Sequence, residues 1–298
     1  MAVTAARPPW MERPSLLSQM GKAVFLILLS AVVIVPFMYI VSVSFSSYRD
    51  VVGGGLILIP RNPTLLAYET VLRGGIVQRA LQVSIGITVI GTTLNTLFSV
   101  LMAYGLSRPG MPGGRFILVL VLFTFLFSPG IIPNYLLVKQ LGLLDSFASL
   151  ILPTLIGAFN LVILRNFFMN IPVELMDSAR LDGASELQTL WHIVLPLSKA
   201  VLAVVILFYG VEHWNSFFDA ILYLNDSSKW PIQLVLRQYV LQGSSLAAGL
   251  EVDPNQPPPP AQTIQMAVVV IATVPILLVY PFLQKYFTQG VLTGAIKG

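Results

Sequence analysis

The chain of 298 residues contains no cysteine, only two histidines and few charged residues. Without cysteine, disulfides, thiolate metal sites and cysteine nucleophiles are excluded. His192 and His213 lack the spacing of a histidine-based metal motif, so we expect no metal and no cofactor bound by this chain itself. Charged residues make up 10% of the chain, against about 25% in soluble domains, and hydrophobic residues make up 56%. This composition predicts an integral membrane protein.

A nucleotide-binding loop is absent as well. The pattern Gly-x-x-x-x-Gly-Lys-Ser/Thr does not occur, and Gly21-Lys22 lacks the preceding glycine. The net charge of +4 would suggest nucleic acid in a soluble chain, but with so few charges the basic excess is expected to orient the protein in a bilayer. We therefore expect no nucleic-acid partner, no catalytic residue and no energy-transducing chemistry within this chain.

Six apolar runs are long enough to cross a membrane, since a helical span takes about 20 residues. They cover residues 23–45, 80–106, 116–137, 147–164, 197–222 and 264–287. The first run lies too far from the start and is too long for a cleaved signal, so we expect it to be retained. The sequence thus predicts an all-α membrane domain over 23–287, with an N-terminal segment 1–22 and a tail 288–298.

The distribution of Lys and Arg predicts which loops lie in the cytoplasm. With the N-terminus inside, ten of the 17 basic residues fall on the cytoplasmic side and seven outside. We therefore expect both termini inside, a cytoplasmic loop over 165–196, and external loops near 46–79 and 225–263. The second external loop contains the proline-rich stretch 254–260, which favours an extended segment, either as a contact for another protein or as a passive linker.

The loop before the fifth apolar run is polar yet compatible with helix formation. Pro172 suits the start of one short helix, and Ser185 with Gln188 predicts a capping box for a second. Gly183 marks the bend between them. An amphipathic hairpin on lipid headgroups is the alternative, but acidic residues outnumber basic ones in the loop and anionic lipid would not favour that. We expect the loop to dock into another protein, with apolar contacts from Leu175, Leu181, Leu187 and Leu190.

The spacing within this loop resembles the EAA loop through which membrane subunits of binding-protein-dependent ABC importers grip their ATPases. Asp177-Ser178-Ala179 is followed after three residues by Gly183 and after nine more by Ile193. Asp177 and Ser178 stand where the family usually has Glu and Ala. The resemblance implies a type I importer permease fold with six transmembrane helices and coupling helices between spans four and five. It assigns ATPase docking to Glu174, Asp177, Ser178, Ala179, Asp182, Gly183, Ala184, Ile193 and Pro196.

The resemblance extends over most of the chain and narrows to carbohydrate importers, in particular permeases for oligosaccharides and polysaccharide fragments. Five segments carry it, residues 104–108, 130–139, 141–145, 213–220 and 230–237. It implies a homologous second permease, two ATPase subunits that hold ATP and Mg, an extracytoplasmic binding protein and the cytoplasmic (inner) membrane. The expected substrate is an oligosaccharide, with acidic fragments such as those of alginate favoured.

The C-terminal tail resembles that of the maltose-type permease, which reaches into the ATPase dimer interface. This implies a regulatory contact at Thr293, Gly294 and Lys297. A frayed tail is the alternative.

A substrate pathway is predicted from polar residues that a bilayer makes costly. Glu212, Asn215 and Asp219 fall on one face if the fifth run is a single helix, with Trp214 alongside. Carboxylates, amides and aromatic rings suit a sugar, whose hydroxyls need hydrogen-bond partners and whose ring faces stack on aromatics. Glu212 pairing with a partner subunit, and Trp214 as an interfacial aromatic, are the alternatives.

Further polar residues lie in the third and fourth runs. Asn134 and Tyr135 follow two prolines that should distort the outer end of the third run, and Asn160 lies inside the fourth. We expect these three as substrate contacts, although a hydrogen bond between helices is the commoner role of a buried amide. Two rival classes remain: a self-contained secondary transporter, and a membrane enzyme with acid–base chemistry at Glu212, His213 and Asp219.

Overall fold

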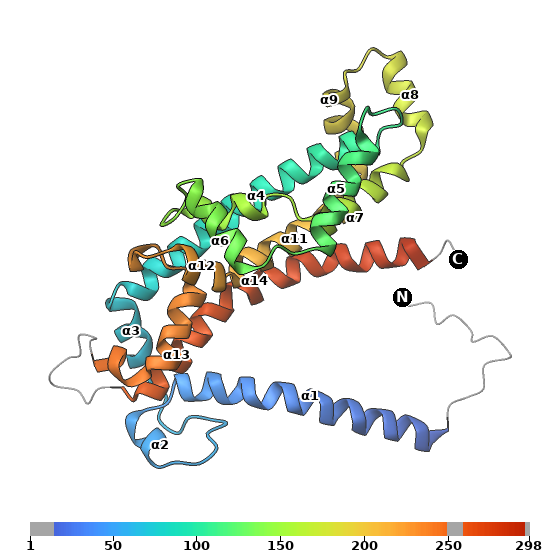
Figure 1. Cartoon of the computed structure of the whole chain (residues 1–298). Coiled ribbons are helices and arrows are strands. Elements are labelled where there is room, and N and C mark those ends of the chain that lie inside the picture. Colours follow the sequence, from blue (N-terminus) through green and yellow to red (C-terminus); the bar gives the residue numbers. More distant parts are fainter. Residues whose placement is uncertain (1–14, 249–258, 296–298) are drawn as a thin grey trace.

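Helices make up most of the part of the chain that the computed structural model describes, residues 15–248 and 259–295 (Figure 1). Within these ranges the sole β-type pairing is an isolated bridge between Ser46 and Pro63. Three helices are each long and apolar enough to cross a membrane: α1 (Leu16–Ser44), α4 (Ile76–Ser107) and the Ala261–Val279 part of α14 (Ala261–Ala295). They match the first, second and sixth predicted runs.

The third predicted run is not one helix but two. It divides into α5 (Gly114–Leu126) and α6 (Ile131–Gln140), with a break over residues 127–130. Pro129 lies in the break and Pro133 in the first turn of α6, which is where proline is tolerated because no helical hydrogen bond is lost there. The distortion expected from these prolines is present, but α5 alone is too short to cross a bilayer.

The fourth and fifth runs are bent as well. The fourth comprises η1 (Phe147–Leu150), η2 (Leu152–Thr154) and α7 (Ala158–Met169), with a bend of 48° before α7. The fifth divides into α11 (Lys199–Asn215) and α12 (Phe218–Tyr223). Counting bent helix pairs as spans, the described residues provide three to five candidate spans, which does not confirm all six predicted spans.

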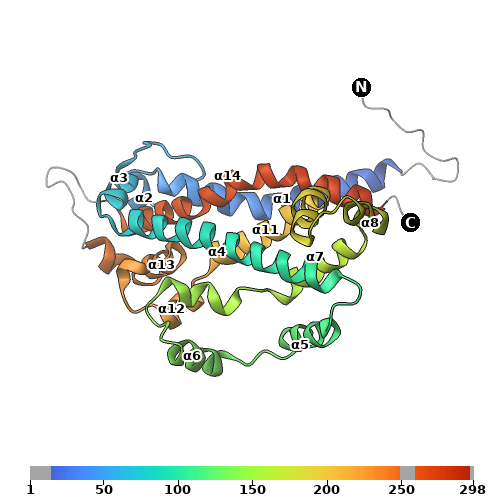
Figure 2. The same cartoon turned by 90° about the horizontal axis from the view of Figure 1, so that it is seen from above.

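Helix α4 is the central element of the bundle. It packs against α11, α7 and α13 (Ile232–Ala248) (Figure 2), whereas α1 meets α14 near one end and then diverges from it, with most of its surface uncovered (Figure 1). At the crossing of α4 and α11, a Cβ added to Gly91 would stand 2.5 Å from Nε2 of His213, so only glycine fits there. Small residues that allow such close approach are typical of helix packing in membranes.

The two ends of α4 meet different structures (Figure 1). At one end lie α8 (Val173–Leu181) and α9 (Glu186–Thr189), which continue through a π-helical turn (Leu190–Val194) and α10 (Leu195–Leu197) into α11. At the other end lie α2 (Tyr48–Val52), α3 (Leu66–Arg73), α13 and the short η4 (Ser227–Lys229). The elements outside the apolar runs therefore gather at opposite ends of the bundle.

Neighbouring helices satisfy the backbone at the break before α7. Asn95 of α4 donates from Nδ2 to the Thr154 carbonyl at 3.0 Å, and the Gly157 amide donates to the Tyr209 hydroxyl at 2.9 Å. The Tyr209 hydroxyl is also 2.7 Å from the Ser99 hydroxyl. Broken helices within a bilayer are tolerated where other elements satisfy the freed groups in this way.

Candidate functional site

The loop that joins α7 to α11 folds as two short helices with a bend, as its sequence predicts. Pro172 precedes α8, and Gly183 takes a φ of +77°, which favours glycine. The capping box at the start of α9 is complete, since Ser185 Oγ accepts from the Gln188 amide at 3.3 Å and Gln188 Oε1 accepts from the Ser185 amide at 2.8 Å. These local contacts hold α8 and α9 as a hairpin, hereafter the α8–α9 loop.

The surface of the α8–α9 loop is polar with large apolar side chains set into it. Leu181 is 89% exposed and Leu187 62% exposed, and Leu175 and Trp191 are exposed too. A group of apolar side chains on a surface that faces water usually marks a site that a partner covers. Leu190 does not belong to this surface: it is 1% exposed and packs in the core cluster with residues of α4 and α11, which corrects its expected role as a contact.

Seven of the nine predicted docking residues lie in the α8–α9 loop, while Ile193 lies in the π-helical turn and Pro196 in α10. Ala179 is buried and Ala184 and Ile193 are half-buried, so these three support the fold of the loop more than its surface. The remaining six are exposed: Glu174, Asp177, Ser178, Asp182, Gly183 and Pro196.

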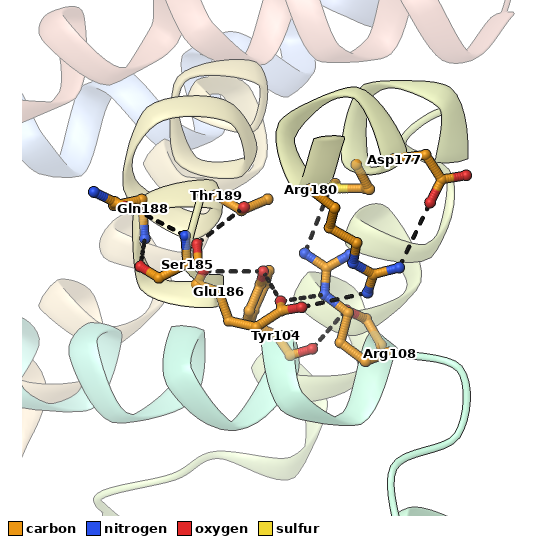
Figure 3. Close-up of polar contacts among 10 residues, drawn as sticks. Tyr104, Arg108, Asp177, Arg180, Ser185, Glu186, Gln188 and Thr189 are labelled. Carbon is orange, nitrogen blue, oxygen red and sulfur yellow. Dashed lines mark hydrogen bonds and ion pairs between the residues drawn. The ribbon is translucent and has the colours of Figure 1, made fainter. Parts of the chain in front are cut away.

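Glu186 connects the α8–α9 loop to the end of α4 (Figure 3). Its Oε2 accepts a 2.6 Å hydrogen bond from the Tyr104 hydroxyl and lies 3.5 Å from Nε of Arg108. Its Oε1 is 3.3 Å from Arg180, which also pairs with Asp177 at 3.5 Å. The Tyr104 hydrogen bond, more than the two arginines, lowers the pKa of the Glu186 carboxyl below its usual value, although partial burial opposes this.

Sequence reasoning did not assign a role to Glu186, Tyr104 or Arg108. Tyr104 and Arg108 are spaced i and i+4 at the end of an apolar run, with the guanidinium 4.0 Å above the tyrosine ring. That spacing marks a polar end of a helix, but their partner is 82 residues away from Tyr104 in sequence. A pattern in one sequence holds no signal for such a pairing.

A second candidate site is a cleft of about 190 Å³ at the end of α11. Glu212, Asn215 and Asp219 all line it, together with Phe217 and Phe218. The single helix face predicted for them was wrong, since α11 ends at Asn215. The chain turns at residues 216–217, and α12 then brings Asp219 to the same cleft. Among the described residues that line this cleft, none is Lys or Arg.

The other predicted pathway residues lie elsewhere. Trp214 is 5% exposed and donates from Nε1 to the Ala272 carbonyl at 3.2 Å, on the side of α11 that faces α14. Tyr135 stacks on Tyr223 with ring centroids 6.4 Å apart, and its neighbour Asn134 is half-buried. Asn160 is buried within α7, and its Oδ1 has no hydrogen-bond partner among the described residues. None of these four lines the α11 cleft.

A third polar cluster lies at the opposite end of the bundle from the α8–α9 loop. Asp145 accepts at Oδ1 from the amides of Asn225 and Asp226, and Lys229 donates to Oδ2 at 2.7 Å. Lys229 is the main reason that the pKa of Asp145 lies below its ordinary value, and the Asp226 amide adds to this. Asp145 has a φ of +56°, alone in this among the described non-glycine residues. The sequence offered no signal for this cluster.

The structure describes only part of two predicted regions, the C-terminal tail and the proline-rich stretch. Thr293 and Gly294 belong to the last turn of α14, while Lys297 lies outside the described residues. The proline-rich stretch lies outside them up to residue 258.

Comparison with known proteins identifies the family. Residues 83–293 match the model of the binding-protein-dependent transport system inner membrane component. The chain belongs to this family. It is 49% identical over 274 residues to the polygalacturonan/rhamnogalacturonan transport system permease protein YtcP of Bacillus subtilis, covering 92% of this chain and 96% of that protein. Protein LplC of the same organism is 48% identical over 268 residues, 90% of each chain.

A solved structure shares both fold and sequence with this permease. It belongs to a bacterial ABC transporter involved in the import of the acidic polysaccharide alginate, with a TM-score of 0.85 and 31% identity, covering 94% of this chain and all of that one. The predicted class, a permease of an ABC importer in the inner membrane, is thereby confirmed, as is its all-helical fold. Family membership favours this class over a secondary transporter or a membrane enzyme.

Proposed function

We propose that this permease forms half of the translocation pathway for an oligosaccharide and works with a homologous second permease, two ATPase subunits and an extracytoplasmic binding protein. The observation that carries the proposal is the group of exposed leucines on the α8–α9 loop, at the end of the bundle opposite α3 and α13 (Figure 1). ATP and Mg would be held by the ATPases. The chain's own part is mechanical, in that helices rearrange while the ATPases open and close.

The proposed topology has six crossings, of which the third, fourth and fifth are interrupted. The breaks at residues 127–130, before α7 and after α11 shorten each helix, but the combined segments remain long enough to cross. The Lys and Arg distribution supports both termini and the α8–α9 loop inside. Discontinuous helices are common where a membrane protein lines a water-filled path.

The substrate proposed is an acidic oligosaccharide. Two similar proteins are named for polygalacturonan/rhamnogalacturonan and for alginate, all of which contain uronic acids. The α11 cleft fits the hydroxyls of a sugar, because Glu212 and Asp219 can accept and Asn215 can both donate and accept. Its carboxylates would repel a uronate, and we propose that cations of the second permease balance this charge. A drug-sized ligand needs a pocket of about 300 Å³ or more, so one chain encloses only part of the site.

Transport by the reconstituted complex tests the proposal. The permease pair, the ATPases and the binding protein are placed in liposomes and supplied with oligogalacturonates, alginate oligomers or neutral maltooligosaccharides. We expect ATP hydrolysis to rise with an acidic oligomer and the permease alone to transport nothing. Uptake by this chain without ATPases would overturn the subunit assignment, and stimulation by the neutral sugar alone would overturn the substrate.

A further inference from the structure

The polar contacts between the α8–α9 loop and α4 converge on the carboxylate of Glu186 (Figure 3). Tyr104 and Arg108 belong to the end of α4, and Arg180 to the end of α8. The three side chains approach the same carboxylate, Tyr104 and Arg108 at Oε2 and Arg180 at Oε1. The Tyr104 hydroxyl is also 3.1 Å from the Glu186 carbonyl. One residue therefore joins α4, α8 and α9.

Apolar contacts also join the loop to the bundle. Met176, Leu190 and Val194 pack in one cluster with Val100 and Ala103 of α4. Apolar packing holds surfaces together without fixing direction. Hydrogen bonds to a charged group are directional and stronger than those between neutral groups. The Glu186 contacts thus set how the α8–α9 loop is oriented on the end of α4.

The contacts of Glu186 are unequal. The hydrogen bond from Tyr104 is short, at 2.6 Å, whereas the ion pair with Arg108 is 3.5 Å long. Nε of Arg108 is hidden from solvent and makes no hydrogen bond to any described residue. Its terminal nitrogen instead approaches Met176 Sδ at 3.4 Å. The ion pair with Arg108 is therefore the looser of the two contacts at Oε2.

Two residues of α4 contact residues that line the α11 cleft. Asn95 of α4 binds the carbonyl of Thr154, and Thr154 lines the cleft. Gly91 of α4 packs against His213, which lines the cleft too. Both walls of the cleft therefore touch the helix that Glu186 holds. These contacts form a physical path from the loop to the cleft, and a measured coupling between the two sites tests whether that path is used.

We infer that Glu186 is a positioning residue through which the α8–α9 loop moves α4 and, with it, the walls of the cleft. The inference rests on the proposed function, in which this loop docks an ATPase. Glu186 contacts neither nucleotide nor sugar in this arrangement. Substitution of Glu186 is expected to change how much ATP is hydrolysed per sugar transported, without a change in the binding of nucleotide or of sugar.

The experiment compares Glu186→Gln with Glu69→Gln in the complete complex reconstituted in liposomes. Glu69 is an exposed glutamate on α3 that pairs with Arg73, at the other end of the bundle. Three quantities are measured: ATPase retained on the purified permease, ATP hydrolysed, and sugar transported. For Glu186→Gln we expect normal ATPase retention and a rise of about fivefold in ATP consumed per sugar, the low end of ordinary coupling between sites. Glu69→Gln should leave the ratio unchanged.

Tyr104→Phe supplies an independent variant, since it removes one hydroxyl and keeps the ring beneath Arg108. It should raise the same ratio in the same direction. If both variants retain the ATPase and the ratio stays at the wild-type value, the inference is wrong. If both instead lose the ATPase, Glu186 belongs to docking and the inference is also wrong. A wild-type permease that fails to bind the ATPase would instead contradict the proposed function.

Discussion

Lys229 places its ammonium group 2.7 Å from a carboxylate oxygen of Asp145, and this pair joins the segment after α6 to the segment after α12. The same lysine reaches the Asp145 carbonyl at 2.7 Å. The pair therefore fixes α6 and α12 to each other at one end of the bundle.

Replacing Asp145 by Asn should destabilise the permease less than replacing it by Ala. Asn keeps an acceptor for the amides of Asn225 and Asp226 and tolerates the positive φ, so it removes the charge and the acceptor for Lys229 while keeping the other contacts. Because the pKa of Asp145 is lowered in the fold, its contribution is present above the ordinary value near 3.8 and is lost as the pH falls through the folded value. Thermal unfolding in detergent at pH 7 and pH 3 measures both effects. Equal midpoints for the two variants would contradict this account.

Three substitutions of Gly183 separate backbone strain from bulk at the docking surface. Gly183→Ala should cost about 1–2 kcal/mol of stability, because a residue with a Cβ disfavours positive φ, and should leave transport intact. Gly183→Asn tolerates that conformation and should keep stability. Nothing lies within 4 Å of a Cβ at this position, so Gly183→Trp projects outward and should retain ATP hydrolysis while losing transport. Normal transport by the Trp variant would refute docking at this bend.

Tyr209→Phe should destabilise the permease by roughly 1–3 kcal/mol, the usual cost of leaving buried polar groups unpaired. The change removes the acceptor for the Gly157 amide and the partner of Ser99. Ser99→Ala is the matched control, since it removes one contact and leaves the Gly157 bond in place. Thermal unfolding should therefore rank wild type above Ser99→Ala and Ser99→Ala above Tyr209→Phe. A Phe variant as stable as the wild type would show that the hydrogen bonds of Tyr209 do not stabilise the break before α7.

Glu212 should tolerate Gln but not Leu. Gln keeps an acceptor for sugar hydroxyls and removes a charge that repels a uronate, so uptake of an acidic oligomer should stay the same or rise. Leu offers no hydrogen bond and should reduce uptake roughly tenfold, about the effect of one lost hydrogen bond to a polar ligand. Uptake into liposomes measures this, with Trp214→Phe as a control outside the cleft. If the Leu variant transports normally, Glu212 does not lie on the pathway.

The sequence predicted most reliably the features that local interactions determine. The capping box at Ser185 and Gln188, the bend at Gly183 and the distortion near Pro129 depend on residues a few positions apart, and all three are present. The family was also predictable, because its motifs lie in contiguous segments.

Contacts between distant segments could not be predicted. Hydropathy alone makes the fifth run look like one helix, since Phe217 and Phe218 are as apolar as a helix interior, yet the chain breaks there. Leu190 has the same hydropathy as exposed Leu187, yet it packs in the core, against residues distant in the sequence. The partners of Glu186 and Asp145 come from other parts of the fold, so no local pattern identified either residue.

The closed break before α7 has a consequence for how the permease can move. Because Asn95 and Tyr209 bind the backbone on both sides of this bend, it is a rigid elbow that turns together with α4 and α11. The break at residues 127–130 differs, since its side chains are exposed and its hydrogen bonds join residues at most four positions apart among those described. We therefore expect more flexing between α5 and α6 than at the bend before α7, and amide hydrogens there should exchange with solvent faster than that of Gly157.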